Sequence, residues 1–213
     1  MSERPNPRTS ALLTIDVQND FTRSESPHAI PGTDELIPVM ADLVAAYRSR
    51  GLPVIHVVRL YEPDGSNAEL SRRAVLAAGA RIVLPGTEGS QLREELAPGP
   101  VELDHAALLA GKLQPVGDAE WLMYKPRWGA FYETPLADHL RALDVDTVAV
   151  IGANFPNCPR TTMYEASERD FHVVAVSDAI SRSYPQGMEE CAGMGALILT
   201  ASEFTAWLSA MEQ

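Results

Sequence analysis

Residues 11–16 have the sequence ALLTID, a continuous apolar run that ends at Asp16. A second apolar run, Val54 to Val58, follows the chain-breaking residues 51–53. Between the two runs, apolar side chains from Leu36 to Tyr47 recur at helical spacing, which predicts an amphipathic helix. Two apolar strands that flank such a helix are typical of a βαβ unit in a parallel sheet.

The alternation of strands and helices continues toward the end of the chain. Strands are expected at Trp121 to Tyr124, Thr147 to Ile151, Val173 to Val176 and Leu197 to Thr200, and helices at Thr134 to Leu143, Arg160 to Arg169 and from Met188 onward. The pattern predicts an α/β fold with a doubly wound, mainly parallel six-stranded sheet and helices on both faces, a Rossmann-like three-layer sandwich. We expect a single domain over residues 1–213 with an irregular excursion at about 60–119, in which helices are expected at 69–77 and 90–96.

The composition limits the classes of partner. The formal net charge is −12, with 17 basic against 29 acidic residues, whereas a nucleic-acid partner requires clustered Lys and Arg. The apolar runs are far shorter than the ~20 residues of a membrane-spanning helix, and residues 1–10 are too polar for a signal peptide. We therefore expect a cytoplasmic protein that acts on a small molecule and has no nucleic-acid or membrane partner.

Three candidate catalytic side chains, Asp16, Lys125 and Cys158, follow predicted strands. In an open parallel sheet, ligands bind beyond the carboxyl ends of the strands. Cys158 also lies at the start of a helix, where the helix dipole and a nearby ammonium group on Lys125 would favour the thiolate. Asp16 is placed to take the thiol proton and to return it to a leaving nitrogen.

Each of these residues has a simpler interpretation when it is taken alone. A single cysteine is more often a small core residue than a nucleophile, and an isolated Asp16 or Lys125 is typical of a solvated position. The combination of three complementary groups at three strand ends favours catalysis. The other cysteine, Cys191, has an apolar helical setting and is predicted to be a core residue.

Three blocks of the sequence resemble the isochorismatase-like hydrolases. They are Ile15 to Phe21 (IDVQNDF), Lys125 to Phe131 (KPRWGAF) and the stretch in which Gly152 precedes Cys158 by six residues. The resemblance covers nearly the whole chain outside the excursion. It implies a doubly wound sheet, a triad of Asp16, Lys125 and Cys158, and a homo-oligomer, either a dimer or a tetramer.

The resemblance also implies how the reacting carbonyl would be held. It implies a non-proline cis peptide bond between Ala153 and Asn154 and an oxyanion hole formed by the backbone N–H groups of Asn154 and Cys158. The turn Phe155-Pro156-Asn157 and the following Pro159 depart from the family pattern, so the shape of the pocket is expected to differ.

Members of the nicotinamidase type hold a metal ion through an Asp-x-His pattern after the second strand. The corresponding residues here, 57–62, read VVRLYE and contain no such ligands, so neither a metal ion nor another cofactor is expected. His56 lies inside the predicted strand and is interpreted as a hydrogen-bonded core residue. The remaining histidines show no spacing typical of metal ligands.

Six side chains near the three motifs are candidates for binding the substrate. Four are aromatic and two are arginines that could pair with a carboxylate: Phe21, Trp128, Phe155, Tyr164, Arg160 and Arg182. For three of them a simpler interpretation stays open, because Phe21 and Tyr164 could pack in the core and Arg160 could be a solvated helix residue.

The leading hypothesis is a cysteine-dependent hydrolase that cleaves the C–N bond of a small amide, ureido or carbamoyl compound through an acyl-cysteine intermediate. One alternative is isochorismatase-type hydrolysis of a vinyl ether, for which Asp16 would act as the acid and no thiol is needed. The presence of Cys158 weighs against it. The other alternative is a non-catalytic binding module, because a fold alone does not fix a function.

Overall fold

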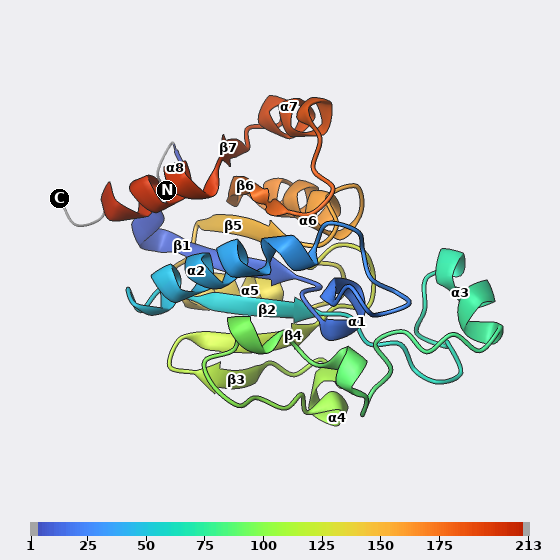
Figure 1. Ribbon diagram of the computed structural model, residues 1–213. Helices are drawn as coiled ribbons and strands as arrows, with labels where there is room; N and C mark the ends of the chain where they lie inside the picture. Colours follow the sequence, from blue (N-terminus) through green and yellow to red (C-terminus); the bar gives the residue numbers. More distant parts are fainter. Residues whose placement is uncertain (1–3, 211–213) are drawn as a thin grey trace.

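The computed structural model describes residues 4–210 and contains a central sheet with helices packed around it (Figure 1). The strands are β1 (Ser10–Ile15), β2 (Val54–Val58), β3 (Gln114–Gly117), β4 (Glu120–Tyr124), β5 (Thr147–Gly152), β6 (His172–Ile180) and β7 (Leu197–Leu199). The helices are α1 (Asn19–Thr22), α2 (Ile37–Arg48), α3 (Leu70–Ala77), α4 (His105–Leu109), α5 (Leu136–Ala142), α6 (Cys158–Ser167), α7 (Pro185–Gly193) and α8 (Ala201–Ser209).

The seven strands lie in the order β3-β4-β2-β1-β5-β6-β7, and every neighbouring pair except β3 with β4 is parallel. β1 is the central strand of this order. Its last residue, Ile15, is in register with Val57 of β2 on one side and with Gly152 of β5 on the other. The carboxyl ends of these three strands therefore meet at one edge of the sheet, and residues that follow them are brought together.

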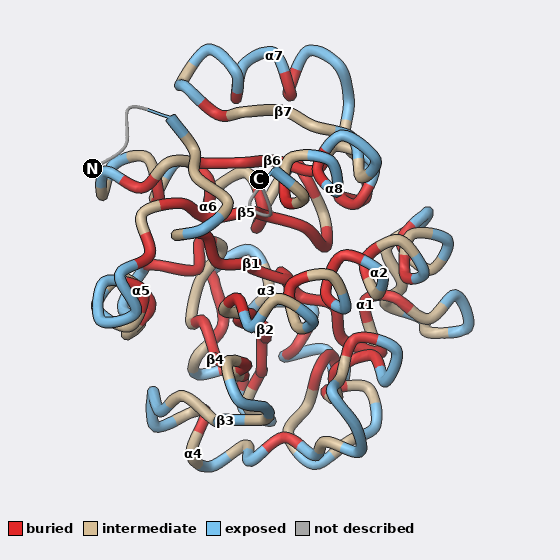
Figure 2. Tube along the Cα trace, turned by 90° about the vertical axis from the view of Figure 1, so that its left-hand side faces the viewer, coloured by how far each residue is buried: buried red, intermediate tan, exposed pale blue. Residues whose placement is uncertain are grey.

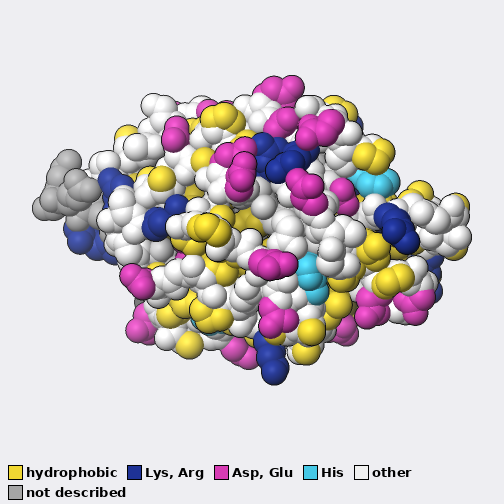
Figure 3. All heavy atoms as spheres, turned by 60° about the horizontal axis from the view of Figure 1, so that its bottom comes forward, with side chains coloured by type: hydrophobic (Ala, Val, Ile, Leu, Met, Phe, Trp, Pro, Cys, Tyr) yellow, Lys and Arg dark blue, Asp and Glu magenta, His cyan; other side chains and the backbone are white. Residues whose placement is uncertain are grey.

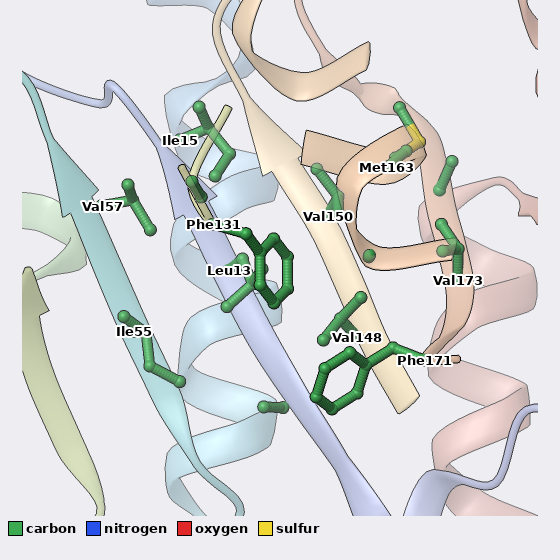
Figure 4. Close-up of a cluster of buried hydrophobic side chains, with 14 of the residues drawn as sticks. Leu13, Ile15, Ile55, Val57, Phe131, Val148, Val150, Met163, Phe171 and Val173 are labelled. Carbon is green, nitrogen blue, oxygen red and sulfur yellow. The ribbon is translucent and has the colours of Figure 1, made fainter. Parts of the chain in front are cut away.

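Helices cover both faces of the sheet, which gives the predicted three-layer α/β architecture. On one face, Leu12 of β1 packs with side chains of α2 and α8, among them Tyr47 and Phe204. On the other face, Leu13 of β1 belongs to a cluster with side chains of α5, α6 and α7. Figure 4 shows part of this cluster, including Leu13, Val150 and Met163 of α6. Because successive strand residues point to opposite faces, the apolar run 11–15 is buried throughout (Figure 2).

The expectation of six strands is wrong by one, because the edge strand β3 was not anticipated. This strand has the sequence QPVG and pairs antiparallel with β4, with a register shift between Pro115 and Gly117. Proline and glycine are ordinarily turn signals, and both tolerate an edge position where the ladder is interrupted. The sheet is therefore mostly parallel with one antiparallel edge strand.

Several helix boundaries also differ from those expected. α6 begins at Cys158, as expected from the placement of Cys158 at a helix start, and ends at Ser167 rather than Arg169; Pro159 fits its first turn, where the missing N–H is not needed. The helix expected over 90–96 is instead two short 3-10 turns at 88–90 and 94–96. α8 was not anticipated, although Thr200 and Glu203 form a capping box at its start.

The excursion after β2 is attached to the end of β1 through the side chain of Gln18. Its Nε2 donates hydrogen bonds to the carbonyl oxygens of Arg59 and Ser90, and its Oε1 accepts one from the N–H of Arg59. α3 lies on the side of the molecule toward which β1 and β2 run (Figure 1). The excursion therefore extends over the edge of the sheet at which the strand ends meet.

The surface reflects the acidic composition. Asp and Glu side chains are spread across the face shown in Figure 3, among scattered hydrophobic groups. Within residues 4–210, no helix is both long enough and apolar enough to cross a membrane.

Candidate active site

Asp16 is the first residue after β1, and its backbone turns sharply there. Its φ angle is 55°, in the left-handed region that residues other than glycine rarely adopt. Its N–H still donates to the carbonyl oxygen of Val57, so the turn is held against β2. The carboxylate is buried at the edge of the sheet and lines a cavity.

Lys125 follows β4 and is fully buried. Its Nζ lies 3.0 Å from Oδ2 of Asp16 and 3.3 Å from Sγ of Cys158, and it donates a hydrogen bond to the carbonyl oxygen of Arg127 at 3.1 Å. An ammonium group has three hydrogens to donate, and these three acceptors match them. The structure thus brings the three predicted catalytic side chains together around one nitrogen atom.

Cys158 is the first residue of α6 and is reached by a tight turn from the end of β5. At Gly152 the φ angle is 118°, and an added Cβ would lie 2.3 Å from the carbonyl oxygen of Ile15, so only glycine allows β5 to approach β1 this closely. The peptide bond between Ala153 and Asn154 is cis. The N–H groups of Asn154 and Cys158 have no hydrogen-bond acceptor among the described residues.

The electrostatic setting of Cys158 differs from the thiolate expected at a helix start. Burial, and next the negative charge of Asp16, raise the pKa of the thiol far above its ordinary value, and the ammonium of Lys125 only partly opposes them. Burial disfavours the ammonium form of Lys125, yet the negative charge of Asp16, and that of Cys158 when the thiol is ionised, outweigh this and raise the pKa of Lys125. The resting site therefore holds a neutral thiol beside a buried ammonium, and the thiol needs a base.

Asp16 has an atom free to serve as that base. Its Oδ2 pairs with Lys125, whereas its Oδ1 is buried and has no hydrogen-bond partner among residues 4–210. A buried carboxylate oxygen without a donor is costly unless a ligand or a proton occupies it.

The cavity above these groups has a volume of about 350 Å³, part of it open to solvent. One wall is formed by the catalytic candidates and their neighbours, namely Asp16, Phe21, Lys125, Trp128, Ala153, Asn154, Asn157 and Cys158. The opposite wall comes from the loop after α1 and from the excursion, namely Ile30, Arg59, Tyr61, Glu69 and Arg72.

Two of the six predicted substrate-binding residues, Phe21 and Trp128, line this cavity, and the other four do not. Phe155 is fully buried in the core on the far side of its turn, where its ring packs edge-on against Tyr184. Arg182 lies in the turn after β6, outside the cavity.

Arg160 and Tyr164 lie on the outer side of α6. The guanidinium of Arg160 forms an ion pair with Glu190 and donates to the hydroxyl of Tyr184 at 3.0 Å. The side chain of Tyr164 is exposed, and the guanidinium of Arg160 lies over its ring. The simpler interpretation of Arg160 as a residue of a helix surface therefore describes it better than carboxylate binding.

The opposite wall of the cavity was missed by the sequence reasoning, although one signal for it was present. Arg59 directly follows β2, as Asp16 follows β1, so the rule that found the catalytic candidates also applies to it. Its buried guanidinium donates to Oε1 of Glu69 at 3.1 Å and to the hydroxyl of Tyr124 at 3.0 Å. Glu69 in turn accepts a hydrogen bond from the hydroxyl of Tyr61 at 2.8 Å.

His56 is a buried, hydrogen-bonded core residue, as interpreted from the sequence. Its Nδ1 is 2.8 Å from Oγ1 of Thr14 and its Nε2 is 2.7 Å from Oε1 of Glu120. Among the residues described, no group of three or more His, Cys, Asp or Glu side chains is placed to hold a metal ion.

The three-layer α/β fold and the grouped Asp, Lys and Cys side chains are those expected of an isochorismatase-like hydrolase. Residues 10–203 match the family model for the isochorismatase domain, and the chain therefore belongs to the isochorismatase family.

Known proteins similar to this chain support that assignment. The crystal structure of an isochorismatase family protein from Desulfovibrio vulgaris subsp. vulgaris str. Hildenborough is 32% identical, covers 94% of this chain and 98% of its own, and superimposes with a TM-score of 0.80. A probable inactive nicotinamidase of Arabidopsis thaliana is 29% identical over 84% of each chain. The ureidoacrylate amidohydrolase RutB of Methylobacterium radiotolerans is 24% identical over 96% of this chain and 77% of its own.

Proposed function

We propose that this protein is an amidohydrolase that uses Cys158 to cleave the C–N bond of a small amide, ureido or carbamoyl compound. The observation that carries the proposal is the position of Lys125 Nζ, 3.0 Å from Asp16 and 3.3 Å from Cys158 at the base of the cavity. A nucleophile, a carboxylate and a charge that stabilises both anions are the groups that acyl transfer requires.

In the first step, Oδ1 of Asp16 accepts the proton of the Cys158 thiol as Sγ attacks the carbonyl carbon. The ammonium of Lys125 stabilises the negative charge as it moves from the carboxylate to the sulfur. The carbonyl oxygen gains a negative charge and accepts hydrogen bonds from the N–H groups of Asn154 and Cys158. The absence of any acceptor for these two N–H groups among the described residues supports their role as donors to the carbonyl oxygen of the substrate.

In the second step, the C–N bond breaks and the leaving nitrogen takes the proton from Asp16, so ammonia or an amine departs. An acyl-cysteine remains. Asp16, again ionised, accepts a proton from a water molecule that attacks the acyl carbon. The C–S bond then breaks, the sulfur takes that proton from Asp16, and the acid is released with the thiol and the carboxylate restored.

The amidohydrolase name of the RutB relative supports this class of reaction. Ammonia release from a panel of primary amides, ureido acids and N-carbamoyl compounds is expected for the wild type and not for Cys158→Ala.

Cys191→Ala is the matched control, because Cys191 is the other thiol and is buried in the core. This variant is expected to keep its activity. Intact mass of the enzyme quenched during turnover should show the added acyl group on the wild type and none on Cys158→Ala. Ammonia release by Cys158→Ala would contradict the proposed cysteine-dependent hydrolysis. Turnover of isochorismate by that variant would instead favour vinyl-ether hydrolysis with Asp16 as the acid.

A further inference from the structure

The charged side chains that line the cavity do not balance one another. Two pairs are formed, Asp16 with Lys125 at 3.0 Å and Glu69 with Arg59 at 3.1 Å. The remaining charged side chain, Arg72, forms neither an ion pair nor a side-chain hydrogen bond with any of residues 4–210. The cavity therefore carries one uncompensated positive charge.

Arg72 is also held in place on its backbone side. It lies in the first turn of α3, and its N–H donates to the carbonyl oxygen of Glu69 at 2.9 Å. Glu69 is in turn anchored by Arg59 and by the hydroxyl of Tyr61. Residues three apart lie on the same side of a helix, so Arg72 is presented to the cavity beside this anchored group.

We propose that Arg72 binds a carboxylate of the substrate, so that the substrate is a small amide or ureido compound with one negative charge. This inference rests on the proposed amidohydrolase function. A guanidinium is planar and binds a carboxylate through two parallel hydrogen bonds, and a half-buried site strengthens such a pair. Arg72 and Cys158 line the same cavity, which is partly open to solvent, so a short substrate can contact both side chains.

Alkylation of Cys158 tests the charge preference without any turnover. Iodoacetate carries a carboxylate where iodoacetamide carries a neutral carboxamide. The alkylation rate of each reagent at Cys158 is measured by peptide mass spectrometry. Each rate is then divided by the rate of the same reagent with N-acetylcysteine, which corrects for the different intrinsic reactivity of the two reagents. Arg72→Gln is expected to lower the normalised iodoacetate-to-iodoacetamide ratio about 10-fold or more, the range for a charge-assisted hydrogen bond. Arg72→Lys should retain part of the preference.

Arg81→Gln is the matched control, because it removes one positive charge from an exposed position of the same excursion that does not line the cavity. It is expected to leave the ratio unchanged. An unchanged ratio in Arg72→Gln, or an equal fall in Arg81→Gln, would overturn the assignment. Unchanged thermal unfolding of both variants shows that the fold is kept.

Turnover of matched substrates separates this inference from the proposed function. Succinamate and butanamide, and N-carbamoylglycine and ethylurea, each differ by a carboxylate in place of a methyl group. Arg72→Gln is expected to lower kcat/KM about 10- to 100-fold for the charged member of a pair and little for the neutral one. If Arg72→Gln shifts the alkylation ratio but the wild type releases ammonia from none of the compounds, the proposed amidohydrolase function is refuted, whereas carboxylate binding by Arg72 is supported. Equal losses for both members would refute the Arg72 site alone.

Discussion

The Nζ atom of Lys125 lies 3.0 Å from Oδ2 of Asp16, and both side chains are almost completely removed from solvent. Such a pair is stable only while both charges are present. Removing one partner leaves an isolated buried charge, whereas removing both leaves none.

Lys125→Met is therefore expected to lower the free energy of unfolding by about 3–5 kcal/mol, as for other broken buried pairs. The double variant Asp16→Asn/Lys125→Met should be more stable than Lys125→Met alone, although both should release ammonia roughly 10²- to 10⁴-fold more slowly than the wild type. Urea unfolding and an ammonia assay measure the two effects. A double variant no more stable than the single one would contradict the buried-pair account.

The charge of Asp16 is expected to have opposite effects on thiol reactivity and on turnover. Because its carboxylate is one cause of the raised pKa of Cys158, Asp16→Asn should lower that pKa and increase the thiolate fraction at neutral pH. Alkylation by iodoacetamide at pH 7 should then become faster, roughly tenfold for each unit by which the pKa falls. Ammonia release should fall at the same time. Slower alkylation of Asp16→Asn would show that the carboxylate does not disfavour the thiolate.

Gly152→Ala tests the close approach of β5 to β1. The new Cβ would meet the backbone of Ile15 and would require a φ angle that alanine rarely adopts, so a loss of about 1–3 kcal/mol or more in the free energy of unfolding is expected.

Gly193→Ala is the matched control for that variant. Gly193 lies in α7, and no atom would be within 4 Å of the added Cβ. Alanine favours a helix over glycine, so this variant should be as stable as the wild type or more stable by up to about 1 kcal/mol. Urea midpoints that shift equally for the two variants would rule out the steric explanation.

Stability should depend on acid pH through Glu120. Burial opposes ionisation of this carboxyl, but hydrogen bonds from Arg48 and His56 prevail and lower its pKa from 4.5 to about 2. The pKa of Glu120 is lower in the folded protein than in the unfolded chain, so its ionised form stabilises the fold. This contribution to the free energy of unfolding is complete above pH 4.5 and is lost as the pH falls from 4.5 to about 2. The loss is up to about 3 kcal/mol. The lowered pKa of buried His56 acts in the same direction below its ordinary value.

Urea unfolding between pH 7 and pH 2 measures this effect. Glu120→Gln should flatten the dependence below pH 4.5, and Glu168→Gln, at an exposed site with the same change of charge, should not. A Glu120→Gln curve that runs parallel to the wild type would assign the acid sensitivity to other groups.

The parts of the site that could be predicted from the sequence are those governed by local signals. Asp16 and Lys125 each follow a strand whose apolar run is visible in the sequence, and parallel strands place their carboxyl ends together. The three-layer fold followed from the same runs. The edge strand β3 was missed because Pro115 and Gly117 conceal the alternation of a strand.

The side chains proposed to contact the substrate could not be predicted in full, because their positions depend on contacts between residues that are distant in the sequence. Phe155 is three residues from Cys158, yet its ring points into the core, because its N–H is tied to the carbonyl oxygen of Ser181 and its ring meets Tyr184. Arg72 is 86 positions from Cys158, the difference between the two residue numbers, yet it lines the same cavity, next to a Glu69 that Arg59 and Tyr61 hold by hydrogen bonds.

Cys158 and the residues that support Arg72 pack in different hydrophobic clusters. Cys158 belongs to the cluster that includes Leu13 and Val150, whereas Tyr61 and Leu76 belong to a small separate cluster with Ile82, which also contains Phe21 of the first wall. If Arg72 selects the substrate as proposed, exchange of residues 60–83 is expected to alter which molecules are accepted while the reacting groups stay in place. Substrate selectivity and reactivity would then reside in parts of the chain that can change independently.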